Sequence, residues 1–77
     1  MKQKQYSDAF IGRNIQSARI AEGLTQEQLA AKLQVSGCDI SRGTLAKIEV
    51  GLRHIYAYEI KEFKKILKVD YDFLFKN

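Results

Sequence analysis

The sequence predicts an all-α protein. Apolar side chains recur at helical spacing along most of the chain, as they do where one face of a helix is buried. Several of these segments follow a Ser, Thr or Asp, whose side chain accepts a hydrogen bond from the free N–H groups of a helix start. The chain contains no proline, and no stretch of useful length alternates as a strand does. These observations favour a small bundle of helices.

The 77 residues suffice for one domain, so we expect residues 1–77 to form a single domain with a small core. A hydrophobic content of 45% is typical of a globular protein. No apolar run is long enough to span a membrane, and the first residues lack the apolar stretch of a signal peptide. We therefore expect a cytoplasmic protein without a membrane partner. The formal net charge of +4 agrees with an anionic partner but is weak evidence alone.

The chain has one cysteine, Cys38, and one histidine, His54. An intrachain disulfide is therefore impossible, and a metal site of four nitrogen or sulfur ligands cannot be built. We interpret Cys38 as a reduced residue in a loop. His54 has no nucleophile or carboxylate at a recognisable spacing. We expect no catalytic residue, no cofactor and no small-molecule ligand, and the protein is not predicted to be an enzyme.

The first helix is predicted over residues 8–22. Residues 1–6 are polar, and we expect them to form a disordered arm. The buried stripe of this helix follows the i, i+4, i+7 rule and consists of Ile11, Ile15 and Ala18. Gly23 should end the helix.

A second helix is predicted over residues 26–34. Thr25 and Gln28 have the spacing of a capping box, in which each side chain bonds to the backbone N–H of the other residue. Leu29 and Leu33 lie four residues apart and therefore share one face, which should be buried.

A third helix is predicted over residues 42–50, with Ser41 as its N-cap and Gly51 just after its end. Leu45 and Ile48 lie three residues apart and should face inward. The other faces of this helix carry Arg42, Gly43, Thr44 and Lys47.

The connection between these two helices is predicted to be unusually long, because Leu33 and Ser41 are eight positions apart in the sequence. A turn of three or four residues is common between two such helices, and we estimate an excess of about five residues over that. We expect Val35 and Ile40 to pack inward and residues 36–39 to bulge out.

The remaining chain predicts two further helices, one over residues 57–67 and a short one from Tyr71, capped by Asp70. The lysines of the longer helix are interpreted as a solvated face, with phosphate contact as the alternative. We expect Tyr56 and Tyr58 to pack against this helix, with hydrogen bonds from their hydroxyls to phosphates as the alternative. Near the end of the chain, Val69, Phe73, Leu74 and Phe75 either close the core or form a partner surface.

Three segments carry a resemblance to a known family. They read IGRNIQSARIAEGLTQEQLAAKL, ISRGTLAKIEVG and YEIKEFKKILKVDYDFLF. On these residues, about residues 8–75, the chain resembles the Cro/phage-repressor type of helix-turn-helix domain, the XRE family. The resemblance implies a five-helix, lambda-repressor-like DNA-binding domain with its helix-turn-helix at residues 25–51. It also implies binding to double-stranded operator DNA, usually as a homodimer, and hence a transcription regulator, which we expect to be a repressor.

The resemblance implies three groups of site residues. The positions facing bases in the major groove are Arg42, Gly43, Thr44 and Lys47. The expected phosphate contacts are Gln26, Ser41 and Arg53. A structural ion pair between the first and third helices would join Arg19 and Glu49. Since Arg42 and Lys47 lie about 140° apart round a helix, we expect one to read bases and the other to reach phosphate, with Arg42 as the reader.

The chain departs from the family pattern at the long turn, at Gln34, where a glycine is common, and at Gly43, where a base-reading side chain is common. These departures leave an alternative open. The chain could be a protein-interaction module, or an antitoxin-type partner, that uses the same fold to dock on a protein.

Overall fold

The computed structural model describes the backbone of residues 4–77 and the side chains from residue 9 onward. The described residues form five helices and no strand, which confirms the all-α prediction. The helices are α1 (Lys4–Ala21), α2 (Gln26–Val35), α3 (Arg42–Glu49), α4 (Ala57–Leu67) and α5 (Tyr71–Phe75). The first helix begins earlier than predicted, so residues 4–6 of the expected arm lie within α1, and residues 1–3 lie outside the described part.

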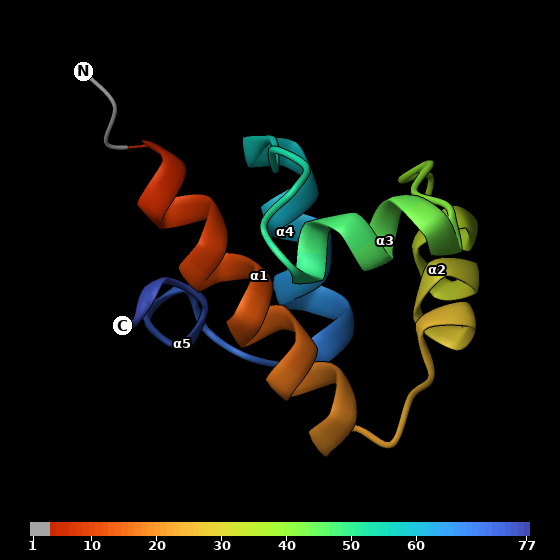
Figure 1. Ribbon diagram of the computed structural model, residues 1–77. Helices are drawn as coiled ribbons and strands as arrows, with labels where there is room; N and C mark the ends of the chain where they lie inside the picture. Colours follow the sequence, from red (N-terminus) through yellow and green to blue (C-terminus); the bar gives the residue numbers. More distant parts are fainter. Residues whose placement is uncertain (1–3) are drawn as a thin grey trace.

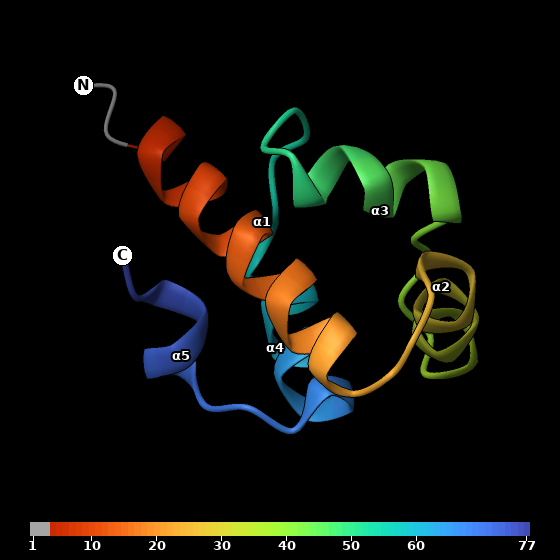
Figure 2. The same cartoon turned by 60° about the horizontal axis from the view of Figure 1, so that its bottom comes forward.

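Helix α1 packs against three of the other helices, namely α3, α4 and α5. Figure 1 shows α3 in the upper right of the view, running from α2 at one end toward α1 at the other. In Figure 2, α5 lies beside α1 while α2 lies at the far side of the molecule. Helix α2 packs against α3 and α4. This arrangement leaves one long side of α3 without a covering element.

The core contains the apolar residues that the helical spacing predicted. Ile11, Ile15 and Ala18 of α1 are buried, as expected of one stripe on a helix. The large side chains with less than 2% exposure come from all five helices and the α2–α3 connection, and they are Ile15, Leu29, Leu33, Ile40, Leu45, Ile48, Phe63, Leu67 and Leu74. The predicted inward faces of the second and third helices are therefore confirmed.

The predicted caps are also present. Thr25 accepts a hydrogen bond from the backbone N–H of Gln28 at 3.0 Å, and the Gln28 side chain accepts one from the backbone N–H of Thr25 at 2.9 Å. Ser41 accepts from the N–H of Thr44 at 3.1 Å, and Asp70 accepts from the N–H of Phe73 at 2.8 Å. These bonds satisfy donors that each helix start leaves unpaired.

The α2–α3 connection differs from the prediction. Helix α2 continues through Val35, so the connection consists of residues 36–41 and is shorter than expected. Val35 is 89% exposed rather than packed inward, because a residue two positions after Leu33 points about 200° away from it round the helix. Cys38 is 2% exposed rather than part of a bulge, and its backbone N–H donates to the Leu33 carbonyl at 2.8 Å. Burial raises the pKa of the Cys38 thiol.

Asn14 is a buried polar residue that the sequence reasoning did not single out. Its side-chain nitrogen donates to the carbonyl oxygens of Leu74 at 2.8 Å and Lys76 at 2.9 Å. These are orphan acceptors at the end of α5, so Asn14 fastens the last helix to α1. In the part of the chain that the structure describes, no helix has both the length and the apolar character needed to cross a membrane.

Candidate nucleic-acid interface

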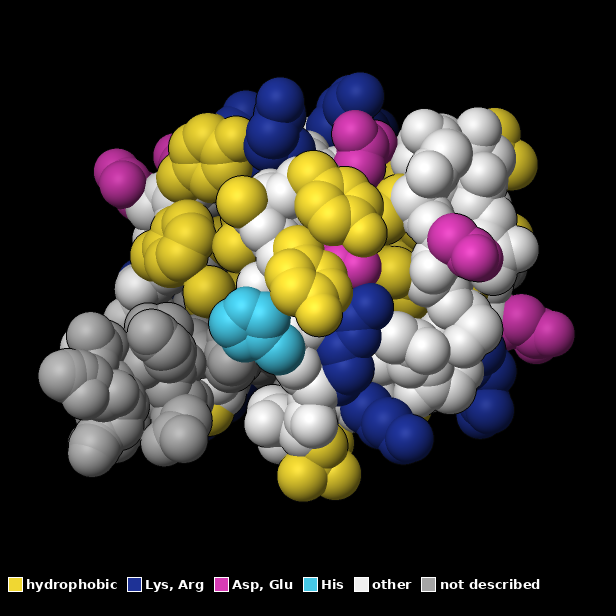
Figure 3. Space-filling model, turned by 90° about the horizontal axis from the view of Figure 1, so that it is seen from above, with side chains coloured by type: hydrophobic (Ala, Val, Ile, Leu, Met, Phe, Trp, Pro, Cys, Tyr) yellow, Lys and Arg dark blue, Asp and Glu magenta, His cyan; other side chains and the backbone are white. Residues whose placement is uncertain are grey.

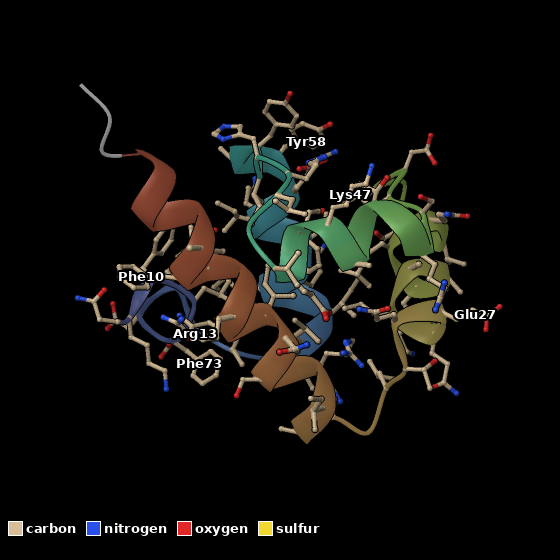
Figure 4. All side chains as sticks on the ribbon, viewed as in Figure 1. Phe10, Arg13, Glu27, Lys47, Tyr58 and Phe73 are labelled. Carbon is tan, nitrogen blue, oxygen red and sulfur yellow. The ribbon has the colours of Figure 1, made fainter. Side chains whose placement is uncertain are left out.

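The two sides of α3 have different surroundings. Leu45 and Ile48 are fully buried beneath the helix, while Arg42, Gly43 and Lys47 are exposed. Figure 4 shows the Lys47 side chain pointing away from the body of the molecule. The candidate base-facing residues therefore lie on the surface of a helix that its apolar side anchors.

The position of α3 depends on a close backbone contact with α1. A Cβ atom at Gly12 would overlap with the carbonyl oxygen of Ile48 and lie 3.1 Å from that of Glu49. Only glycine allows this approach. The signal in the sequence was an isolated glycine inside a helical pattern, which often marks close packing, and we did not assign it a role.

Arg19 and Glu49, which were expected as a structural ion pair, lie in direct contact. Arg19 donates from Nε to Oε2 of Glu49 at 2.7 Å and from Nη2 to Oε1 at 3.1 Å. Its Nη1 also donates to the carbonyl oxygen of Leu24 at 2.8 Å. The Glu49 side chain is fully buried. The pair therefore joins the end of α1 to the end of α3 with two parallel bonds of fixed geometry.

Gln26, an expected phosphate contact, belongs to the same network. Its side-chain nitrogen donates to Oε1 of Glu49 at 3.0 Å, and Gln26 is the first residue of α2. Glu49 thus holds the start of α2 in a fixed position beside α3. The N-terminus of a helix carries free N–H groups and a partial positive charge, both of which favour a phosphate.

Gln26 and Arg42 come together in one open, polar hollow, which we call the α2–α3 hollow. Its volume is about 430 Å³, and its lining residues are Arg19, Thr25, Gln26, Glu27 and Arg42. Two of the five carry a guanidinium group, and Glu27 contributes one opposing charge. The fold thus brings an expected phosphate contact and an expected base reader to one place.

Ser41 and Thr44, expected to contact DNA, are bonded to each other. The Ser41 hydroxyl donates to the Thr44 hydroxyl at 3.1 Å and also accepts the cap bond from the Thr44 backbone. Ser41 is exposed and Thr44 is half-buried. Both hydroxyl groups are thus oriented by the helix start before any ligand is present.

Arg53, another expected phosphate contact, forms an ion pair with Glu59. Its Nη1 and Nη2 donate to the two carboxylate oxygens of Glu59 at 2.7 and 3.0 Å, and Nη1 also donates to the His54 carbonyl at 2.6 Å. The hydrogen bonds to Glu59 raise the pKa of Arg53. The sequence analysis did not predict this ion pair, which ties the segment after α3 to α4. Glu59 is 2% exposed and lies in the first turn of α4.

Next to α3 lies an exposed group of rings, the aromatic patch, formed by His54, Tyr56 and Tyr58. The tyrosine rings are nearly parallel with centroids 6.1 Å apart, and the His54 ring meets Tyr56 edge-on at 5.3 Å. Tyr56 is 50% and Tyr58 63% exposed, so the expectation that they pack against the helix was wrong. Figure 3 shows these rings with lysine and arginine side chains beside them.

Metal binding has no support in the described residues, among which no three His, Cys, Asp or Glu side chains are grouped so that they could hold an ion.

The geometry defines a class of protein. Two helices meet through a connection, the start of the first lies beside the second, and the polar side of the second is bare. This is the arrangement with which a helix-turn-helix enters the major groove of DNA.

Comparison with known families agrees with this assignment. The sequence model of the helix-turn-helix family matches residues 15–74, so the chain belongs to the helix-turn-helix family, of the Cro/C1 or XRE type. It is therefore a DNA-binding protein of the regulator class. No curated protein and no solved structure matches the chain.

Proposed function

We propose that the protein is a sequence-specific transcription regulator of the cytoplasm, a repressor that acts by occupying an operator in double-stranded DNA. The observation that carries this proposal is the bare side of α3, with Arg42, Gly43 and Lys47 exposed beside the start of α2. The fold holds this side rigidly, since Glu49 of α3 is bonded to both Arg19 and Gln26. A rigid, cationic helix can enter a groove without the loss of conformational entropy that ordering a flexible segment would cost.

Arg42 is proposed as the main base reader. Its forked donors match O6 and N7 of guanine, a pairing worth about 1–3 kcal/mol of discrimination. Gln26, in the same hollow, would hold the adjacent phosphate together with the N-terminus of α2. Lys47 is exposed farther along α3 and would reach a phosphate. Thr44 would touch the backbone or a thymine methyl, and Gly43 would let the helix backbone approach the bases closely.

The active form is proposed to be a homodimer on a two-fold related site, because one short helix of this size reads few base pairs. Half-sites should then lie about 34–36 Å apart, one turn of the duplex. Binding should weaken steeply with added salt as counterions are released from the phosphates.

The test has two steps. DNA that binds the protein is first selected from a random pool, and the affinity of the selected site is then measured against random DNA. Arg42→Ala combined with Lys47→Ala should weaken binding to the selected site by about 100-fold or more, from the loss of a base pairing and a phosphate contact. The matched control removes two other exposed lysines, Lys32→Ala with Lys65→Ala, and should change affinity far less.

Equal binding of selected and random DNA, or equal loss in the two double variants, would refute this function. The alternative is that the same fold docks on a protein, and the exposed aromatic patch and Leu52, which is 78% exposed, support it. The same Arg42 and Lys47 variant separates the two readings, because binding of a protein through the patch would survive it while binding of operator DNA would not.

A further inference from the structure

A second hollow lies between α4 and α5, and none of its residues belongs to the candidate DNA interface. We call it the α4–α5 groove. Its volume is about 390 Å³, and its lining residues are Ala57, Ile60, Lys61, Tyr71 and Phe75. The two helices that form it are labelled in Figure 1.

The groove is apolar although it is open to water. Tyr71 is 43% exposed and Phe75 50% exposed, and Ile60 is only half-buried. Two large rings and an aliphatic side chain around one hollow form a contiguous apolar surface rather than scattered residues, and such surfaces commonly mark interaction sites.

The border of the groove is positively charged. Lys61 is one of its lining residues, and Nζ of Lys64 lies 5.2 Å from the centre of the Tyr71 ring. Ala57, Lys61 and Lys64 lie at spacings of four and three residues, so one face of α4 carries them all. We call Lys61 and Lys64 the lysine rim.

We infer that the α4–α5 groove is a docking site for an acidic amphipathic helix of another protein. Such a helix would place an apolar stripe in the groove and Asp or Glu side chains against the lysine rim. This mode of recognition uses apolar anchors for affinity and complementary charge for specificity and fast association.

Two other occupants fit less well. A nucleic acid would match the lysine rim, but its phosphate backbone has no apolar ridge to fill the groove. A second copy of the chain would bring two lysine rims together, which is unfavourable.

The inference adds a role that does not depend on the proposed function. Because the groove and the DNA interface share no residue, one molecule could hold a partner helix and an operator together.

The probe for the test is a synthetic 15-residue peptide with leucine at every third or fourth position and glutamate at most others. A control peptide has the same leucines with lysine in place of glutamate. Fluorescence anisotropy should show the acidic peptide binding at least about tenfold more tightly than the basic one, since charge complementarity against the rim differs in sign. Lys61→Glu and Phe75→Ser should each weaken binding of the acidic peptide about fivefold or more.

Lys32→Glu on α2 is the matched control, because it makes the same charge change at an exposed lysine outside the groove, and it should leave peptide binding nearly unchanged. Circular dichroism of all three variants would confirm that the fold is kept, and their affinity for selected DNA should be unaltered. The inference is overturned if both peptides bind alike, or if Lys61→Glu and Lys32→Glu act alike. It is also overturned if the protein self-associates in sedimentation and Phe75→Ser abolishes this, which would assign the groove to a second copy.

Discussion

The inner and outer sides of α3 differ in how tightly the rest of the molecule constrains them. On the inner side, a Cβ atom at Gly12 would overlap with the backbone of α3, and Glu49 is held by Arg19 and Gln26. On the outer side, a Cβ atom at Gly43 would meet nothing within 4 Å. The difference teaches that stability and ligand affinity should depend on separate residues of one eight-residue helix.

The largest effect is expected on the inner side, from Arg19→Met. Removing one partner of a buried ion pair leaves the other charge without compensation, which costs about 3–5 kcal/mol. Glu49 would be left in this state, since its side chain is fully buried. We expect the free energy of unfolding in urea to fall by this amount, and DNA affinity to fall as well, because Gln26 loses its fixed partner.

Glu49→Leu in the same molecule supplies the control. If the cost comes from the unpaired carboxylate, the double variant should regain much of the stability that Arg19→Met loses. Unchanged folding together with unchanged DNA affinity in Arg19→Met would show that the pair has no structural role.

The next effect is expected from Gly12→Ala. The added methyl group cannot fit against the carbonyl oxygen of Ile48, so α1 and α3 must move apart, and overpacking of this kind costs about 1–3 kcal/mol. Urea unfolding measures the loss. A change below about 0.5 kcal/mol, the size typical of surface positions, would mean that the two helices separate easily and that α3 is not held rigidly.

These inner contacts also show which features of the structure can be predicted from the sequence. The helices, their caps and the buried stripes could be predicted because each depends on residues within one or two turns of one another, as Thr25 and Gln28 do. The burial of Ile40 followed from its apolar character between two helices. Arg19 and Glu49 were paired only through the family resemblance, since 30 positions separate them.

The contacts that were not predicted depend on the packing of segments that are distant in the sequence. No residue near Gly12 or Asn14 in the sequence indicates that Gly12 contacts α3 or that Asn14 bonds to the end of α5. Glu59 was overlooked as the partner of Arg53 because a loop of unknown path separates them. Cys38 turns inward for the same reason. Val35 is different, because its position relative to Leu33 on one helix already predicted exposure once α2 was extended by one residue.

A smaller effect with opposite signs is expected on the outer side, from Gly43→Ala. Alanine in a helix interior is more favourable than glycine by up to about 1 kcal/mol, and the open space at Gly43 lets the protein accept the methyl group. Thermal or urea unfolding should therefore show a gain in stability. Affinity for selected DNA should fall, because the methyl group would stand between the helix and the bases.

Gly12→Ala is the matched comparison, since the same change made on the inner side lowers stability. If Gly43→Ala raised stability and left DNA affinity unchanged, Gly43 would not face the groove, and the part of α3 that approaches the bases would have to be reassigned.

The smallest effect on folding, and the sharpest test of the comparison, is expected from Lys47→Ala. Lys47 is exposed, so the free energy of unfolding should change by no more than about 0.5 kcal/mol. If Lys47 reaches a phosphate, its loss should weaken binding to selected and random DNA alike and reduce the slope of log affinity against log salt by about 1. If it reads a base instead, the loss should fall on selected DNA alone. Arg42→Ala, measured in parallel, should show this second pattern, so that the two residues of one exposed surface are assigned by their opposite dependence on sequence and salt.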